Sequence, residues 1–244
     1  SPMMTRRLLP ACAVVTLAAC SGPTMEADIC LGRNAGDLVV TEVMIDPEGT
    51  DTGGEWIEVF NTLGTPLDMK GLTLYVRDTD GSSSKSHNIR AGTANARGYF
   101  VMGDVRSGPN PAWVNYSYAD ALGTMGNQHG VVGIRCGTKV LAEMTYTVGA
   151  AANRSRMLDG NGDPTTLQAA SEANFCDAPV TSKYFGNNAG TPGAANPRCP
   201  TTTNPPVCDS TAAGHKAGDL IITEFMADPD STDAFVAAVD ALRA

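Results

Sequence analysis

The chain is poor in positive charge, aromatic side chains and histidine. Its 244 residues carry 17 Lys and Arg against 26 Asp and Glu, which gives a net charge of −9, so we expect no nucleic-acid partner. Aromatic residues make up only 6% of the sequence, whereas 26 glycines and 15 prolines punctuate it. Frequent turns favour short strands over long helices.

The sequence also lacks the motifs by which common enzymes are recognised. It contains no G-x-S-x-G nucleophile elbow, no G-x-x-x-x-G-K phosphate loop, no H-E-x-x-H zinc motif and no G-x-G-x-x-G dinucleotide loop. The three histidines lie in polar or glycine-rich segments or in a linker, where a solvated side chain is more common than a general base. We therefore predict that the chain is not an enzyme and holds no obligatory cofactor.

No apolar run reaches the length of about 20 residues that a membrane-spanning helix needs. The one apolar stretch, residues 8–19, follows two arginines and ends in Leu-Ala-Ala before Cys20. A basic segment before a short apolar segment is typical of an export signal, and its end resembles the lipobox of bacterial lipoproteins. The resemblance implies that residues 1–19 are a signal peptide, that Cys20 is lipidated, and that residues 20–35 form a tether. The alternative is that residues 8–19 form a buried strand or helix.

Lipidation at Cys20 would place the protein in the bacterial cell envelope, with the outer membrane as the expected location. The membrane is then one partner, reached through Cys20, because a chain with two or three acyl groups binds stably.

An internal repeat divides the chain. Residues 35–51 and 217–233 are identical at 11 of 17 positions, and their separation suits a whole domain plus a linker rather than a solenoid unit. Residues 199–216 are rich in proline and threonine and form the expected linker. Residues 217–244 then begin a second, incomplete domain. A C-terminal strand and helix that pack on the first domain remain an alternative.

The first copy has a strong strand pattern. Runs rich in β-branched and aromatic residues alternate with turn-forming Gly, Pro, Asn and Asp. No segment shows a sustained helical period, so the pattern predicts an all-β fold with two packed sheets. The expected strands are Asp37–Ile45, Glu55–Asn61, Leu72–Val76, Tyr99–Met102, Val131–Arg135 and Lys139–Val148.

Four motifs in this order carry a resemblance to a known family. They are GDLVVTEVMIDP, GEWIEVFN, LDMKGLTL and GTPGAAN, and together they resemble the lamin tail domain. The resemblance covers about residues 36–198 and implies an immunoglobulin-like β-sandwich, with the second copy truncated. It also implies that Trp56 is a core or sheet-face residue. Nothing corresponds to the lamin rod, so filament assembly is not expected.

Five cysteines follow Cys20, and none has the C-x-x-C spacing of a metal or redox site. In an exported protein they are expected to form disulfides. Cys30 and Cys199 flank the two ends of the domain, and domain termini are often close, so we predict Cys30 with Cys199 and Cys136 with Cys176. Cys208 would find its partner in a complete second domain.

Two segments are candidate binding sites. Asp159, Asn161 and Asp163 alternate oxygen ligands on a glycine-rich loop, which suits Ca²⁺, although ordinary Asx turns explain the same pattern. A second cluster of acids lies between residues 42 and 58.

The other candidate is aromatic. Trp113, Tyr116 and Tyr118 alternate with polar residues, which is typical of an exposed binding platform or of a half-buried strand. Taken together, these features predict a non-catalytic envelope lipoprotein whose β-sandwich serves as a protein- or glycan-binding module. The alternative is an accessory domain of an exported hydrolase or nuclease whose catalytic part is missing from this chain.

Overall fold

The computed structural model describes residues 29–49, 53–161, 163–165 and 171–200. The chain divides into two compact units, residues 1–200 and 201–244, and all described residues belong to the first. The predicted signal peptide, Cys20, Cys208, most of the linker and the second copy lie outside the described residues. Within the described part, no helix is long and apolar enough to cross a membrane.

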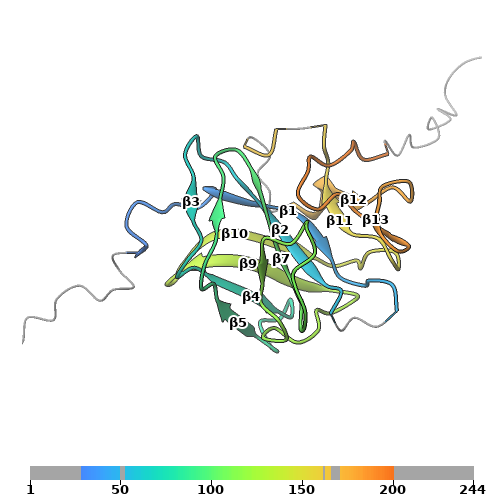
Figure 1. The fold of residues 1–244 in the computed structure, drawn as a ribbon, viewed down its shortest axis with the longest axis horizontal. Helices are drawn as coiled ribbons and strands as arrows, with labels where there is room; N and C mark the ends of the chain where they lie inside the picture. Colours follow the sequence, from blue (N-terminus) through green and yellow to red (C-terminus); the bar gives the residue numbers. More distant parts are fainter. Residues whose placement is uncertain (1–28, 50–52, 162, 166–170, 201–244) are drawn as a thin grey trace, which may run out of the picture. The chain divides into compact units, whose positions relative to one another are not determined.

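The described residues form an all-β fold, as the strand pattern predicts. Its larger sheet has six strands in the order β12-β11-β1-β2-β7-β8 (Figure 1). Neighbouring strands are antiparallel except β7 and β8, which run parallel. The strands are β1 (Leu38–Met44), β2 (Trp56–Asn61), β7 (Tyr99–Gly103), β8 (Tyr116–Ser117), β11 (Arg156–Leu158) and β12 (Phe175–Asp177).

The second sheet has four antiparallel strands in the order β10-β9-β4-β5. Two short strand pairs, β3 with β6 and β13 with β14, complete the fold, together with one 3₁₀ turn, η1. All six predicted strands are confirmed, with ends that shift by one or two residues. The elements outside the larger sheet are β3 (Leu67–Asp68), β4 (Thr73–Arg77), β5 (Lys85–Asn88), β6 (Thr93–Ala94), β9 (Gly130–Cys136), β10 (Lys139–Tyr146), η1 (Glu172–Asn174), β13 (Lys183–Phe185) and β14 (Asn188–Ala189).

The two main sheets pack on one shared hydrophobic core. Val40 and Val59 of the larger sheet belong to the same buried cluster as Leu74, Ile134 and Met144 of the smaller one. The alternation of apolar residues along each strand directs one set of side chains into this core. The burial of these side chains holds the two sheets together.

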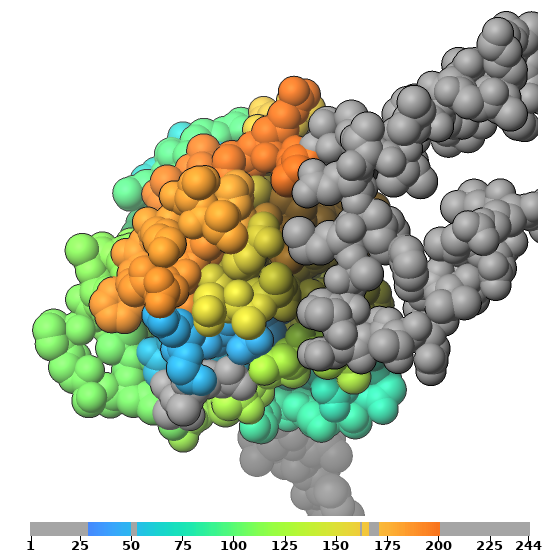
Figure 2. Space-filling model, turned by 90° about the vertical axis from the view of Figure 1, so that its right-hand side faces the viewer, coloured from blue at the N-terminus to red at the C-terminus, as the bar shows by residue number. Residues whose placement is uncertain are grey.

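The central strands β1 and β2 are buried along their whole length, so the opposite face of the larger sheet is covered as well. Met44, Trp56 and Val101 form a small buried cluster there, beneath Trp113 and Tyr184. The covering chain comes largely from the end of the domain, which appears orange in Figure 2. This arrangement gives Trp56 no exposed surface, which confirms its expected place in the core.

Four of the predicted cysteines form disulfides, but the predicted pairing is wrong. Cys30 is bonded to Cys136, with a Cα–Cα distance of 5.4 Å, and Cys176 is bonded to Cys199, at 5.9 Å. The two ends of the domain are joined to different sheets, because Cys136 ends β9 of the smaller sheet and Cys176 lies in β12 of the larger. Cys30 and Cys199 therefore have nearer partners than each other.

Candidate functional site

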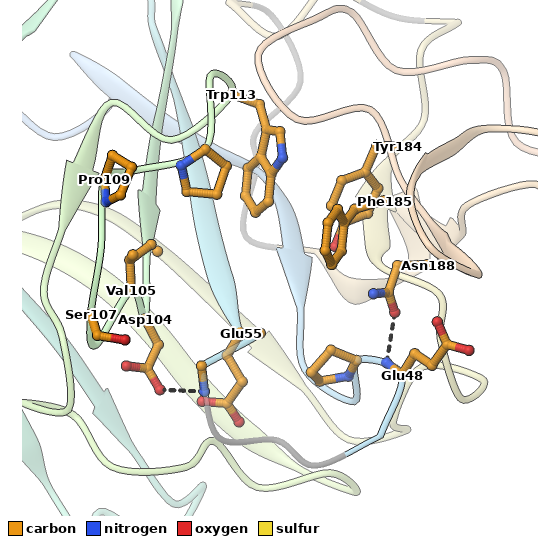
Figure 3. Close-up of a pocket in the computed structure, with 15 residues that line it drawn as sticks. Glu48, Glu55, Asp104, Val105, Ser107, Pro109, Trp113, Tyr184, Phe185 and Asn188 are labelled. Carbon is orange, nitrogen blue, oxygen red and sulfur yellow. Dashed lines mark hydrogen bonds between the residues drawn. The ribbon is translucent and has the colours of Figure 1, made fainter.

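A cleft lies at one end of the larger sheet, where three segments meet. The loop after β1 contributes Glu48, the loop after β7 contributes Asp104 and Trp113, and the β13–β14 hairpin contributes Tyr184 and Phe185. The cleft has a volume of about 340 Å³. Figure 3 shows the aromatic side chains along its upper part and the carboxylates along its lower part.

The aromatic wall is built outward from the core. The Trp56 indole Nε1 donates a hydrogen bond of 2.8 Å to the Tyr184 hydroxyl. The rings of Trp113 and Tyr184 meet edge to face with centroids 5.1 Å apart, and those of Trp56 and Trp113 lie 6.0 Å apart. Phe185 extends this wall into solvent, with 68% of its surface exposed. The wall is therefore rigid at its base and accessible at its rim.

Burial raises the pKa of the Tyr184 hydroxyl well above its usual value, because an ionised phenolate would lose its hydration. The hydroxyl therefore stays protonated at physiological pH and accepts the Trp56 N–H without carrying charge.

Two backbone hydrogen bonds fix the polar side of the cleft. The Glu48 N–H donates to Asn188 Oδ1 at 2.6 Å, and the Gly53 N–H donates to Asp104 Oδ2 at 3.0 Å. Both are drawn in Figure 3, where the side-chain nitrogen of Asn188 points toward the cleft. They tie the loop after β1 to the other two segments, so the cleft is held open by the fold itself.

The charges at the cleft are mostly engaged with neighbours. The Glu48 carboxylate accepts hydrogen bonds from the backbone and side-chain amides of Asn187, and these lower its pKa. Asp104 forms an ion pair with Arg106 at 3.0 Å. Both carboxylates are thus hydrogen-bond acceptors that are oriented before any ligand arrives.

The structure separates the three predicted platform residues. Trp113 lines the cleft, but Tyr118 is 1% exposed and donates to the backbone oxygen of Glu55. The Tyr116 hydroxyl lies 2.7 Å from His87 Nε2, on the smaller sheet's β5. The prediction of one exposed platform from Trp113, Tyr116 and Tyr118 is therefore wrong, because Tyr118, directly after β8, is buried in the core.

The predicted calcium loop forms local turns. Asp159 Oδ1 accepts the N–H of Asn161 at 3.0 Å and that of Cys199 at 2.9 Å. Asp163 Oδ1 accepts the N–H of Thr165 at 2.8 Å. Within the part of the chain that the structure describes, no group of three or more His, Cys, Asp or Glu could hold a metal ion. A Ca²⁺ site at Asp159, Asn161 and Asp163 stays a prediction.

The acids between residues 42 and 58 divide between two places. Glu48 and Glu55 line the cleft, whereas Glu42 and Glu58 are fully buried and face each other across β1 and β2. Sequence reasoning grouped them as one acidic cluster. Their burial follows from the closing segment, residues 190–199, which crosses this face of the sheet.

The closing segment is held by these buried carboxylates. Glu42 accepts the backbone N–H and the hydroxyl of Thr191, each at 2.9 Å, and Glu58 accepts the N–H of Gly193 at 2.7 Å. A Cβ on Gly190 would lie 2.9 Å from a Glu42 oxygen, which explains a glycine there. The GTPG motif therefore supplies hydrogen-bond donors to these two buried carboxylates.

Burial dominates the protonation of this pair. Loss of hydration raises the pKa of Glu42 to about 7, and burial together with the charge of Glu42 raises the pKa of Glu58 well above its usual value. At least one proton is thus retained on the pair at mildly acidic pH. Because protein groups enclose both carboxyls, this site has a structural role.

A scan against models of known protein families finds no match, and a search among curated proteins finds no similar sequence. The cleft must therefore be interpreted from its own geometry.

The sequence did not reveal Tyr184, Phe185 and Asn188 as cleft residues. They lie on a hairpin whose turn carries Gly186 at a φ of +56°, and the only available signal was the aromatic pair before Gly-Asn-Asn. The distance of more than 70 residues between Trp113 and this hairpin hides their association from any local pattern.

Proposed function

We propose that the chain is an exported, lipid-anchored binding module of the bacterial cell envelope. In this proposal an immunoglobulin-like β-sandwich of the lamin-tail type presents a cleft that takes a short segment of neutral glycan. The lipobox-like end at Cys20 and the signal-like residues before it support export. The two disulfides are compatible with an oxidising compartment, and the two sheets on one core are compatible with the sandwich.

The observation that carries the binding function is the composition of the cleft. Ligand sites are concave, largely apolar and supplied with a few fixed polar groups. Trp113 and Phe185 offer flat apolar surfaces on which the C–H face of a sugar ring can lie, and Glu48 offers acceptors for its hydroxyls. The aromatic base is packed in advance, so little conformational entropy is lost on binding.

A non-catalytic role fits the chemistry of the same carboxylates. Hydrolysis of a glycoside needs a protonated carboxylic acid on one side of the bond and a carboxylate on the other. Hydrogen bonds from Asn187 lower the pKa of Glu48, so it is ionised at neutral pH. Asp104 is paired with Arg106 at 3.0 Å, so its oxygens accept hydrogen bonds from that guanidinium. These two groups suit hydrogen bonding to a ligand better than proton donation.

The test is a binding titration of the full chain with neutral oligosaccharides such as cellotriose, maltotriose and chitotriose, followed by calorimetry. The key variant is Phe185→Ala, because this ring is exposed and its loss should leave the fold intact. We expect at least tenfold weaker binding, since a buried aromatic contact contributes on the order of 1.5 kcal/mol or more.

The matched control is Tyr99→Ala, which removes a half-buried ring that packs on Phe60 outside the cleft. It should bind as the unmodified chain does. Equal affinity of the Phe185→Ala variant would reject the cleft as the site. Binding of short peptides but of no oligosaccharide would retain the cleft and reject the glycan.

A further inference from the structure

A second surface of the domain has a different character from the cleft. It is a shallow hollow of about 550 Å³, lined among others by Ile29, Arg33, Lys70 and Arg90. We name the surface formed by these residues together with Leu31 and Lys139 the basic face. It lies where the described chain begins, and nothing in the proposed glycan site uses it.

The basic face is positively charged, although the chain as a whole is negatively charged. Arg33, Lys70 and Arg90 line the hollow, and the Lys139 ammonium joins them through a 2.7 Å hydrogen bond to the Arg33 carbonyl oxygen. None of these four cations takes part in an ion pair among the described residues. The lining contains one carboxylate, Asp68. In a chain of net charge −9, this is a concentrated positive surface.

Apolar side chains accompany these charges. Leu31 is 83% exposed and Ile29 is 40% exposed. Val140, next to Lys139, is also 40% exposed. Exposed large apolar residues beside cations are typical of a surface that lies in the headgroup region of a bilayer, where apolar groups enter the boundary and cations stay with the phosphates.

The fold holds this surface in shape. The disulfide between Cys30 and Cys136 fixes the first loop to the end of β9. The Gly36 N–H donates to the Leu141 oxygen at 2.9 Å, which ties the loop to β10 as well. The cations and apolar residues on either side of the disulfide are therefore presented together rather than on an independent tail.

The position of the basic face in the chain also suits contact with a membrane. This step rests on the proposed lipidation of Cys20. Nine residue steps separate Cys20 from Ile29, and an extended chain of that length spans at most about 32 Å. An acyl group at Cys20 would therefore hold the basic face within that distance of the bilayer surface.

We propose that the basic face lies against the anionic phosphate headgroups of the bilayer that anchors the chain, and so orients the domain. Each cation near such a surface strengthens the docked state by about fivefold, and the effect decays within a Debye length. Docking through this face leaves the glycan cleft, which is built from other loops, free for ligand.

The experiment uses the lipid-anchored protein purified from membranes and reconstituted in two kinds of vesicle. One contains phosphatidylcholine alone, and the other contains added phosphatidylglycerol. Amide hydrogen exchange of residues 29–36 and of the turn at Lys70 reports whether the face is covered. We expect slower exchange of these segments on the anionic vesicles, with the difference reduced by high salt.

The test variant is Arg33→Glu with Lys70→Glu. Loss of two cations should lower the ratio of docked to undocked protein by at least about 25-fold. The matched control is Lys85→Glu with Lys183→Glu, which changes the net charge equally at exposed residues of β5 and β13. The control should keep the slow exchange.

Equal exchange on both vesicles would overturn the docked orientation while leaving the anchor and the cleft untouched. Failure of the protein to associate with either vesicle would reject the lipid anchor, and this inference with it. If a soluble polyphosphate without vesicles slowed the exchange equally, the partner of the basic face would be a soluble polyanion, and the proposed lipid surface would be rejected.

Discussion

Replacing Glu42 by glutamine should change the pH dependence of stability in a direction that ordinary surface acids do not show. Burial raises the pKa of Glu42 from 4.5 to about 7 in the folded protein. The folded state therefore binds a proton more tightly than the unfolded state does. The stability that this provides is complete below pH 4.5 and is lost as the pH rises through 7.

The shift from 4.5 to about 7 corresponds to about 3 kcal/mol, at 1.36 kcal/mol for each pH unit. Titration of Glu42 should therefore cost the native chain about this much stability between pH 5 and pH 8, and Glu58, whose pKa is raised as well, adds to the loss. Glutamine keeps acceptor and donor groups for Ser155 and Thr191 but carries no charge. The Glu42→Gln variant should lose less over the same range by about that amount, because only Glu58 still titrates, and it does so without the charge of Glu42 beside it.

The measurement is urea unfolding at several pH values, followed by the fluorescence of buried Trp56. His87 acts in the opposite direction, since burial lowers its pKa, but it is present in both proteins and cancels in their difference. The matched control is Glu172→Gln, because hydrogen bonds from Thr147 and Val148 lower the pKa of Glu172. Parallel curves for the native chain and Glu42→Gln between pH 5 and pH 8 would refute the reasoning.

Further predictions concern the disulfides and one buried amide. Loss of the bond between Cys30 and Cys136, which spans 106 residues, should cost more stability than loss of the bond between Cys176 and Cys199, which spans 23. Loop entropy gives about 4.7 and about 3.4 kcal/mol, and calorimetry of the serine variants checks the order. Asn61→Ala should cost about 3 kcal/mol, because the two N–H groups of the buried Asn61 side chain are shared among three backbone oxygens at 2.9 to 3.0 Å. A loss below about 1 kcal/mol by urea unfolding would show that water replaces those bonds.

The strands could be predicted because their signal is local. In β1 and β2 the β-branched and aromatic residues alternate between Gly and Pro turns, and the structure places both strands within a residue or two of the expected bounds. The burial of Trp56 could be expected only from the resemblance of its motif, GEWIEVFN, to a known family.

The cysteine pairing and the cleft could not be predicted, because both depend on where distant segments meet. The expectation that Cys30 bonds to Cys199 assumed that the two ends of the domain are adjacent, whereas each end is fastened to a different sheet. Likewise, nothing near Trp113 indicates that Tyr184 will pack on it from the β13–β14 hairpin. The burial of Glu42 depends in the same way on a segment far along the chain.

The distance in sequence between the buried carboxylates and their donors determines how this domain must complete its folding. Thr191 reaches back 149 residues to Glu42, and Gly193 reaches back 135 to Glu58. Such long-range contacts form slowly, because the entropy cost of closing the loop comes before the hydrogen bonds that offset it. A chain that is synthesised from its N-terminus can pair β1 and β2 early. The outer face of these two strands, however, stays exposed to solvent until the last residues of the domain have been made. The interval of exposure to proteases and to aggregation therefore lasts through the synthesis of nearly the whole domain.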